Sequence, residues 1–245
     1  MRVALWTPAP VAGWAAGLVA ELGRELEVVV VSSEPGAPTG ADLDLYHVMG
    51  APAHGFVYRA LVRRPGIVLL GEWQLHALVY AETAGRGEPL AYRREARRAH
   101  GDTGEFVARQ VLAGLGGALG ALLAMNQRVL DQSLALVTLT EELRARAAPL
   151  LAGRRALFLP LDRLAAPAAS RELCAAAAAA LLALVRETAP GAEAQRALLA
   201  AHAAQERSPL GSALAELRWS ARELGLAELP AGAESVVAPL FGSRP

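Results

Sequence analysis

The sequence predicts an α/β fold, a Rossmann-like parallel sheet flanked by helices, with a C-terminal helical extension packed back on it. Short apolar runs alternate with helical segments over the first 160 residues or so, which is the order of a parallel sheet with crossover helices. The run "EVVVVSS" lacks polar–apolar alternation, which is typical of strands buried on both faces. The composition turns helical near residue 163, so we expect a Rossmann-like domain over 1–163 and a helical extension over 164–245.

The first half of the predicted domain contains four strands and two helices. Leu18, Leu22 and Leu26 recur at a spacing of four, which predicts a helix with one apolar face. The loops between the elements are rich in Pro and Gly, which favour turns. The predicted strands cover 2–6, 27–33, 43–49 and 65–71, and the predicted helices cover 14–26 and 52–64.

The second half begins with a long helical stretch from Trp73 to about Asp131, which the Gly-rich patch 114–120 should interrupt. Strands are predicted over 133–140 and 154–162, on either side of a helix that Thr140 should cap. Glu141 and Glu142 fall in the first turn of this helix, where they favour its dipole. The extension should form three helices, over 170–187, 191–207 and 209–225.

The bulk composition excludes some classes of protein. The formal net charge is 0, from 24 basic and 24 acidic residues, which does not suit binding to a nucleic-acid backbone. The single cysteine, Cys174, should pack as a small apolar group. The apolar runs 111–125 and 173–185 are shorter than the roughly 20 residues of a transmembrane helix, and no signal peptide is evident. We therefore expect a cytoplasmic protein with no transmembrane segment, peripheral contact with the inner membrane being the alternative.

Four segments of the chain occur in an order and spacing that resemble a known enzyme family. They read "RVALWTPAPVAG", "DLYHVMGAPAHGFVYRALVRRPGIVLL", "EWQLHALVYAETAGRGEPLAYRREARRAHGDTGEFVARQ" and "MNQRVLDQSLALVTLTEELRAR". Together they resemble the N-terminal, acceptor-side domain of family 4 glycosyltransferases over about residues 1–162. The resemblance implies the two-domain GT-B fold, in which a second Rossmann-like domain binds the sugar nucleotide.

The chain departs from that family after "LPLD", where helices begin in place of the second domain. The segment "SPLGSALAELRWSARELGLAELPAGAESVVAPL" resembles the terminal helix with which such enzymes cross back onto the N-terminal domain. We therefore expect a glycosyltransferase-like protein that lacks the donor-binding domain and does not transfer sugar by itself. It would act as a partner or regulatory subunit, with a full-length glycosyltransferase or a second copy of itself as the candidate partner.

Two other functions fit the same sequence. In one, the chain is an active glycosyltransferase that transfers a hexose from a nucleotide sugar to a glycan or lipid and is completed by a second chain. In the other, it is a carbohydrate-binding module. We expect no cofactor, and no metal site, because the sequence has no CxxC, no HExxH and no clustered acidic triad.

The candidate ligand site lies where strands end and helices begin, at the carboxyl edge of the sheet. Gly13 would let backbone N–H groups approach a ligand at a helix start. Glu72 either binds an acceptor hydroxyl or caps the following helix, and Gly71 stands where the resembling enzymes carry a His. The predicted site residues are Gly13, Trp14, His54, Glu72, Trp73 and His76, and we assign none of them a catalytic role.

Three features near this site have both a ligand-binding and a structural interpretation. Trp73 either stacks on a sugar ring or packs in the core. His76, one helical turn after Glu72, either pairs with that carboxylate or is structural. The Arg-rich segment 91–109 either binds phosphates and acidic lipids or is a solvated helix face with ion pairs between residues four apart.

Overall fold

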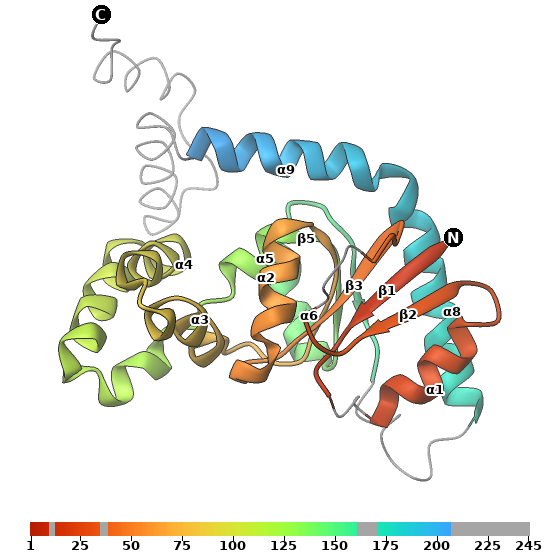
Figure 1. The fold of residues 1–245 in the computed structure, drawn as a ribbon, viewed down its shortest axis with the longest axis horizontal. Coiled ribbons are helices and arrows are strands. Elements are labelled where there is room, and N and C mark those ends of the chain that lie inside the picture. The colour runs from red at the N-terminus through yellow and green to blue at the C-terminus, as the bar shows by residue number, and fades with distance from the viewer. Residues whose placement is uncertain (10–12, 35–38, 161–170, 207–245) are drawn as a thin grey trace, which may run out of the picture.

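The computed structural model of the chain describes residues 1–9, 13–34, 39–160 and 171–206, and it contains one six-stranded parallel sheet (Figure 1). The strand order is β2-β1-β3-β4-β5-β6. The strands are β1 (Arg2–Trp6), β2 (Glu27–Val31), β3 (Leu43–Val48), β4 (Gly66–Leu70), β5 (Ser133–Thr138) and β6 (Ala156–Phe158). The predicted fold class is confirmed.

Helices cover both faces of the sheet. One face packs against α1 (Gly13–Leu22) and α8 (Arg171–Thr188), which also contact each other. The other face packs against α2 (Gly55–Arg63) and α5 (Gln127–Gln132), with α3 (His76–Glu82) and α4 (Pro89–Gln110) outside them (Figure 1). Alternate residues of each central strand enter the two apolar cores, as the pleat requires.

The connecting elements are short. They are the 3-10 helices η1 (Pro52–His54), η2 (Ala84–Arg86), η4 (Gly117–Leu122), η5 (Ala148–Leu150) and η6 (Ala189–Gly191), and the π-helical turn η3 (Val111–Leu115). Helix α6 (Glu141–Ala147) begins after Thr140, whose hydroxyl accepts a hydrogen bond from the Leu143 N–H at 3.2 Å, so the predicted cap is confirmed. Gly-rich η3 and η4 interrupt the helical stretch where the sequence predicted a break.

Two predictions, one for β2 and one for the long helix α4, are wrong in detail. The strand predicted to be buried on both faces, β2, is an edge strand, and its Val30 is 37% exposed. Helix α4 bends sharply at His100 and Gly101, so Arg93 reaches Glu105 across the bend. The Arg-rich segment does form ion pairs, and one of them, Arg109–Glu105, joins residues four apart as predicted. Others join residues across this bend or connect the segment to α5.

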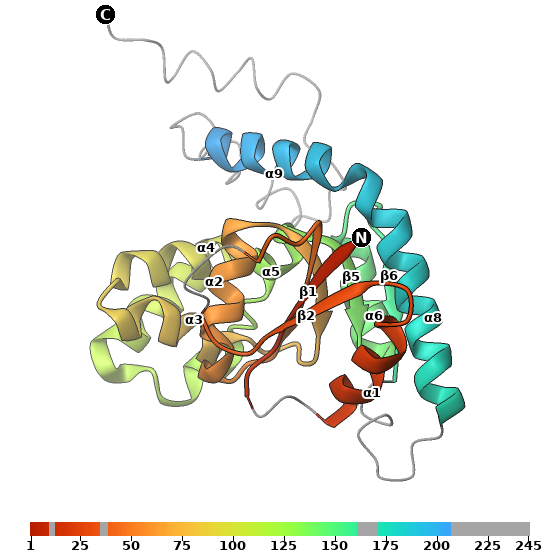
Figure 2. The same cartoon turned by 45° about the vertical axis from the view of Figure 1, so that its right-hand side comes forward.

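The C-terminal extension returns to the sheet, as predicted. Helix α8 packs along one face, and α9 (Ala192–Glu206) turns across the amino edge of the strands (Figures 1 and 2). Cys174 packs partly buried against the apolar core beside Gly17, as predicted. The predicted helix 209–225, the segment that resembles a crossing-back helix and the boundary at residue 163 lie outside the described residues.

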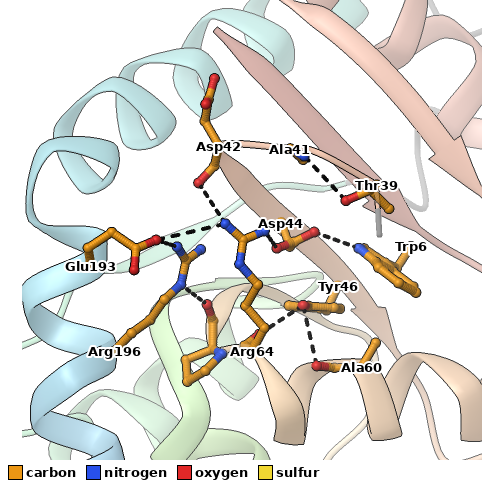
Figure 3. A network of polar contacts seen from close by, with 11 residues as sticks. Trp6, Thr39, Ala41, Asp42, Asp44, Tyr46, Ala60, Arg64, Glu193 and Arg196 are labelled. Atoms are coloured by element: carbon orange, nitrogen blue, oxygen red, sulfur yellow. Dashed lines mark hydrogen bonds and ion pairs between the residues drawn. The ribbon is translucent and has the colours of Figure 1, made fainter. Parts of the chain in front are cut away.

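A network of charged side chains, of which Asp44 and Arg196 are buried, joins α9 to the sheet (Figure 3). The Asp44 carboxylate, 1% exposed, accepts hydrogen bonds from Trp6 Nε1 at 2.8 Å and from Arg64 Nη1 at 2.6 Å. Arg196 of α9 donates from Nε to the Pro65 carbonyl at 2.9 Å and pairs with Glu193. Burial raises the pKa of Asp44, while the hydrogen bond from Trp6 and the two guanidinium groups oppose that rise.

Among the described residues, one stretch, Glu172–Ala201, is long and apolar enough to cross a membrane by length and composition alone. It comprises α8, η6 and most of α9. Such a stretch is weak support for a membrane span, because core helices of globular proteins have the same composition. Here the α8 part packs against α1 and the sheet.

Candidate functional site

Two histidines and a threonine form a connected group at the carboxyl edge of β1 and β3. Thr7 Oγ1 lies 3.0 Å from His47 Nδ1, and His54 Nδ1 lies 2.9 Å from the His47 carbonyl oxygen. A carbonyl only accepts, so His54 carries its proton on Nδ1 and presents Nε2 as an acceptor. All three side chains are buried, at 1%, 4% and 7% exposure for Thr7, His47 and His54.

The His47 ring is enclosed by aromatic neighbours. Trp14, in the first turn of α1, meets it edge to face at a centroid distance of 5.1 Å, and His54 does so at 4.9 Å. His47 Nε2 has no hydrogen-bond partner among the described residues. Burial and the neighbouring His54 lower the pKa of His47 to about 4, and burial also lowers the pKa of His54. Both rings are therefore neutral at pH 7.

Glu72 lies at the same edge, after β4, and is exposed to solvent. Its Oε2 accepts a hydrogen bond from the Gly50 N–H at 3.3 Å. Gly50 has no room for a side chain, since a Cβ there would lie 2.5 Å from the Gln74 carbonyl oxygen. The charge of Glu72 acts to raise the pKa of His54, against the effect of burial, so this carboxylate is electrostatically coupled to the buried pair.

The structure excludes one of the two roles predicted for Glu72, that of a helix cap. Helix α3 begins at His76, with Leu75 in the N-cap position and no side-chain cap. Glu72 is therefore not the cap of the next helix, and its hydrogen bond ties the loop after β4 to the loop after β3. Glu72 is thus an exposed carboxylate that is held by a backbone N–H and can accept hydrogen bonds from the hydroxyl groups of a ligand.

Gly71 faces apolar side chains. A Cβ at this position would lie 3.0 Å from Met49 Cγ and 3.3 Å from Leu139 Cδ1. Both neighbours are themselves partly buried. The position at which the resembling enzymes carry a His is therefore closely surrounded by Met49 and Leu139.

Trp73 and His76 lie on the helical side of this loop. The Arg146 guanidinium covers one face of the Trp73 ring, 4.6 Å from its centroid, and the Trp73 carbonyl accepts from Asn126 Nδ2 at 3.2 Å. His76 Nε2 lies 2.7 Å from the Tyr92 hydroxyl, and its ring contacts Tyr80. His76 therefore does not pair with Glu72, because the direction of α3 turns the imidazole toward α4, and its contacts fit the structural alternative.

The predicted site thus divides into two groups. Trp14 and His54 meet around His47, with Glu72 beside them, and Gly13 begins the helix that carries Trp14. Trp73 and His76 are held by Arg146 and Tyr92. Thr7 directly follows β1, whereas His47 lies inside β3, and both were missed because these segments were assigned as strands. Their position at strand ends was the signal that could have identified them.

No group of three His, Cys, Asp or Glu side chains that could hold a metal ion occurs within the part of the chain that the structure describes. The fold and the position of the His47 group define a Rossmann-like α/β protein with polar side chains at the carboxyl edge of its sheet. The chain matches no known family, no curated protein and no solved structure.

Proposed function

We propose that this chain is a glycosyltransferase-like binding subunit that holds a hydroxyl-rich acceptor at the carboxyl edge of its sheet and does not transfer sugar by itself. One observation carries the proposal. The exposed Glu72 carboxylate is fixed by Gly50 next to His54, while the neighbouring Gly71 has no imidazole and is closely surrounded by Met49 and Leu139. Groups that bind hydroxyls are present, and the expected catalytic side chain is missing.

The electrostatics support binding without transfer. Departure of a nucleoside diphosphate requires positive groups or dipoles placed where negative charge develops. Beside His47 and His54 the charged group is the Glu72 carboxylate, and both imidazoles are neutral, which opposes the departure of a diphosphate there. The nearby Arg146 guanidinium is engaged with the Trp73 ring and with Glu142. The resemblance to the acceptor-side domain points to the same role, in which this chain supplies acceptor binding to a partner glycosyltransferase.

The test combines binding with transfer. Titration calorimetry against a panel of oligosaccharides and glycolipid headgroups should find a ligand whose affinity falls at least tenfold in Glu72→Ala. Glu187→Ala removes an equally charged, exposed side chain on α8, away from the carboxyl edge, and should leave the affinity unchanged.

Labelled nucleotide sugars distinguish the alternatives. Transfer by the purified chain alone, lost in Glu72→Ala, would refute the proposal. Transfer that requires this chain together with a second one would establish the completed-enzyme alternative. Ligand binding with no effect on any glycosyltransferase would leave a carbohydrate-binding module.

A further inference from the structure

The order of the strands places a topological switch point between β1 and β3. From β1 the chain passes through α1 to β2 on one side, and from β3 it passes through α2 to β4 on the other side. The two helices cover opposite faces of the sheet (Figure 1). Open α/β sheets bind their ligands outside the carboxyl ends of the strands at such a point. Thr7 follows β1 and His47 lies near the end of β3, so the buried group described above occupies the switch point.

The contacts of His47 identify the ring nitrogen that carries its proton. Thr7 Oγ1 and His47 Nδ1 lie 3.0 Å apart, and either atom can be the donor. If Nδ1–H donated, the hydroxyl proton of Thr7 and His47 Nε2 would both lack a partner within the described chain. If the Thr7 hydroxyl donates, only His47 Nε2 lacks one. Each buried polar group without a partner costs free energy, so the second arrangement is favoured, and the proton of His47 lies on Nε2.

The two imidazoles are complementary as hydrogen-bonding groups. His47 presents a buried Nε2–H donor that has no partner in the described chain. His54 donates from Nδ1 to the His47 carbonyl and presents Nε2 as an acceptor, and the ring centroids are 4.9 Å apart. A hydroxyl group accepts and donates through a single oxygen, whereas a carboxylate only accepts. A ligand with hydroxyl groups therefore satisfies both rings.

The charges around this pair disfavour an acidic ligand. Both imidazoles are neutral at pH 7, and the charged group beside them is the exposed Glu72 carboxylate. The carboxylate or phosphate of an acidic sugar would be repelled by Glu72. An uncharged sugar can instead donate a hydrogen bond to this carboxylate.

We propose that His47 and His54 make the acceptor site specific for an uncharged sugar, with His47 Nε2–H donating to one sugar hydroxyl while His54 Nε2 and Glu72 accept from sugar hydroxyls. This inference rests on the proposed acceptor-binding function. Trp14 and His54 enclose the His47 ring edge to face, so the ligand hydroxyl reaches Nε2 by parting these two side chains. The buried donor of His47 gains its partner on binding, so a ligand that lacks the hydroxyl is rejected.

Asn and Gln substitutions separate binding from structure, because the Asn amide takes the place of Nδ1 and the Gln amide takes that of Nε2. His47→Asn keeps a partner for Thr7, and His54→Asn keeps the donor to the His47 carbonyl, but both lose the ligand contact. Each should weaken the affinity at least tenfold, whereas His54→Gln should stay within about threefold of the wild type. A structural role for these rings predicts the opposite ranking.

His100→Asn is the control, since it alters a partly buried imidazole of α4 outside the site, and it should change the affinity less than twofold. Circular dichroism checks that each variant is folded. Long-range proton–nitrogen NMR spectra of the free protein should show His47 protonated on Nε2. A spectrum that places this proton on Nδ1 would overturn the inference.

The class of ligand is tested by calorimetry with matched pairs of probes. Neutral oligosaccharides of glucose, galactose or mannose are each compared with a counterpart in which the terminal CH2OH is oxidised to a carboxylate. The neutral member should bind at least tenfold more tightly. Binding that requires Glu72 but is not weakened in either Asn variant, or that does not prefer the neutral member, would overturn this inference and leave the proposed function standing. If no probe bound in a Glu72-dependent way, both would be refuted.

Discussion

Gly50 is the residue that fixes the exposed Glu72 carboxylate, and it does so through its backbone N–H. A Cβ on Gly50 would lie 2.5 Å from the Gln74 carbonyl oxygen and 2.8 Å from Glu72 Oε2. We expect Gly50→Ala to lower the free energy of unfolding by about 1–3 kcal/mol, as overpacking does, and to displace the loop after β4. Urea denaturation measures the first effect, and the affinity for the ligand bound at Glu72 measures the second.

Gly191 provides the matched control, because a Cβ there would contact nothing within 4 Å and its φ is not positive. Gly191→Ala should change stability by less than about 0.5 kcal/mol. Equal effects of the two substitutions would contradict the packing argument for Gly50.

His47 should make the stability of the protein depend on pH. Burial lowers its folded-state pKa to about 4, against 6.5 when unfolded, so the unfolded chain binds the proton more tightly. The contribution of His47 to the free energy of unfolding is complete above pH 6.5. It is lost as the pH falls toward 4, and the total loss is about 3 kcal/mol. The burial-lowered pKa values of His54, His76 and His100 act in the same direction. Urea denaturation at intervals from pH 7.5 to 5 measures the slope.

His47→Asn should flatten that slope, since the amide does not titrate. Glu105→Gln is the control. Hydrogen bonds from Arg93 and Arg109 hold the pKa of Glu105 near 2, so its contribution is lost only below about pH 4.5. If the free energy of unfolding depended on pH in the same way in His47→Asn and in the wild type above pH 5, groups other than His47 would be responsible.

At the scale of elements, the sequence predicted most helices and strands because their signals are local. Apolar runs, Gly-rich breaks and the Thr140 cap each involve neighbouring residues, and the structure contains them. The position of β2 at the edge of the sheet is not local. A run of Val has the same pattern in a central strand as in an edge strand whose two faces are partly covered by helices.

The bend in α4 was missed for a related reason. Gly101 adopts φ 59°, a conformation that favours Gly, and Gly104 lies so close to Ala96 that a Cβ there would be 2.3 Å from its carbonyl oxygen. Two glycines in a helical pattern indicate that the helix is less stable there, but they do not give the direction in which it bends. The pairing of Glu105 with Arg93 depends on that direction, so it could not be predicted.

The candidate site was predictable in place and only partly in composition. Strand ends define the carboxyl edge, and Trp14, His54 and Glu72 do gather there. The orientation of α3 then separates Trp73 and His76 from them. A loop of a few residues can send its side chains to either side of a sheet edge, and sequence spacing does not decide which.

Across the whole molecule, the two ends of the sheet carry different groups. The carboxyl end holds the His47 group and Glu72, whereas α9 crosses the amino end and is tied there by Arg196. In the described chain, the C-terminal extension packs on one face and on the amino end of the sheet. The extension therefore contributes to stability from the side opposite the candidate site, and the two should be separable by mutation.

Arg196→Ala tests that separation. The guanidinium is only 8% exposed, and its loss would leave the Pro65 carbonyl without its donor and remove one of the two cations that act on buried Asp44. We expect a loss of about 1.5–3 kcal/mol in the free energy of unfolding. Hydrogen exchange should accelerate in α9 while β3 and β4 stay protected, and ligand affinity at Glu72 should stay unchanged.

The control is Arg186→Ala, which breaks an exposed ion pair with Glu25 and should lower the free energy of unfolding by less than about 1 kcal/mol. If α9 kept its protection in Arg196→Ala, the apolar contacts of Ala192 and Leu199 would be what holds it to the sheet.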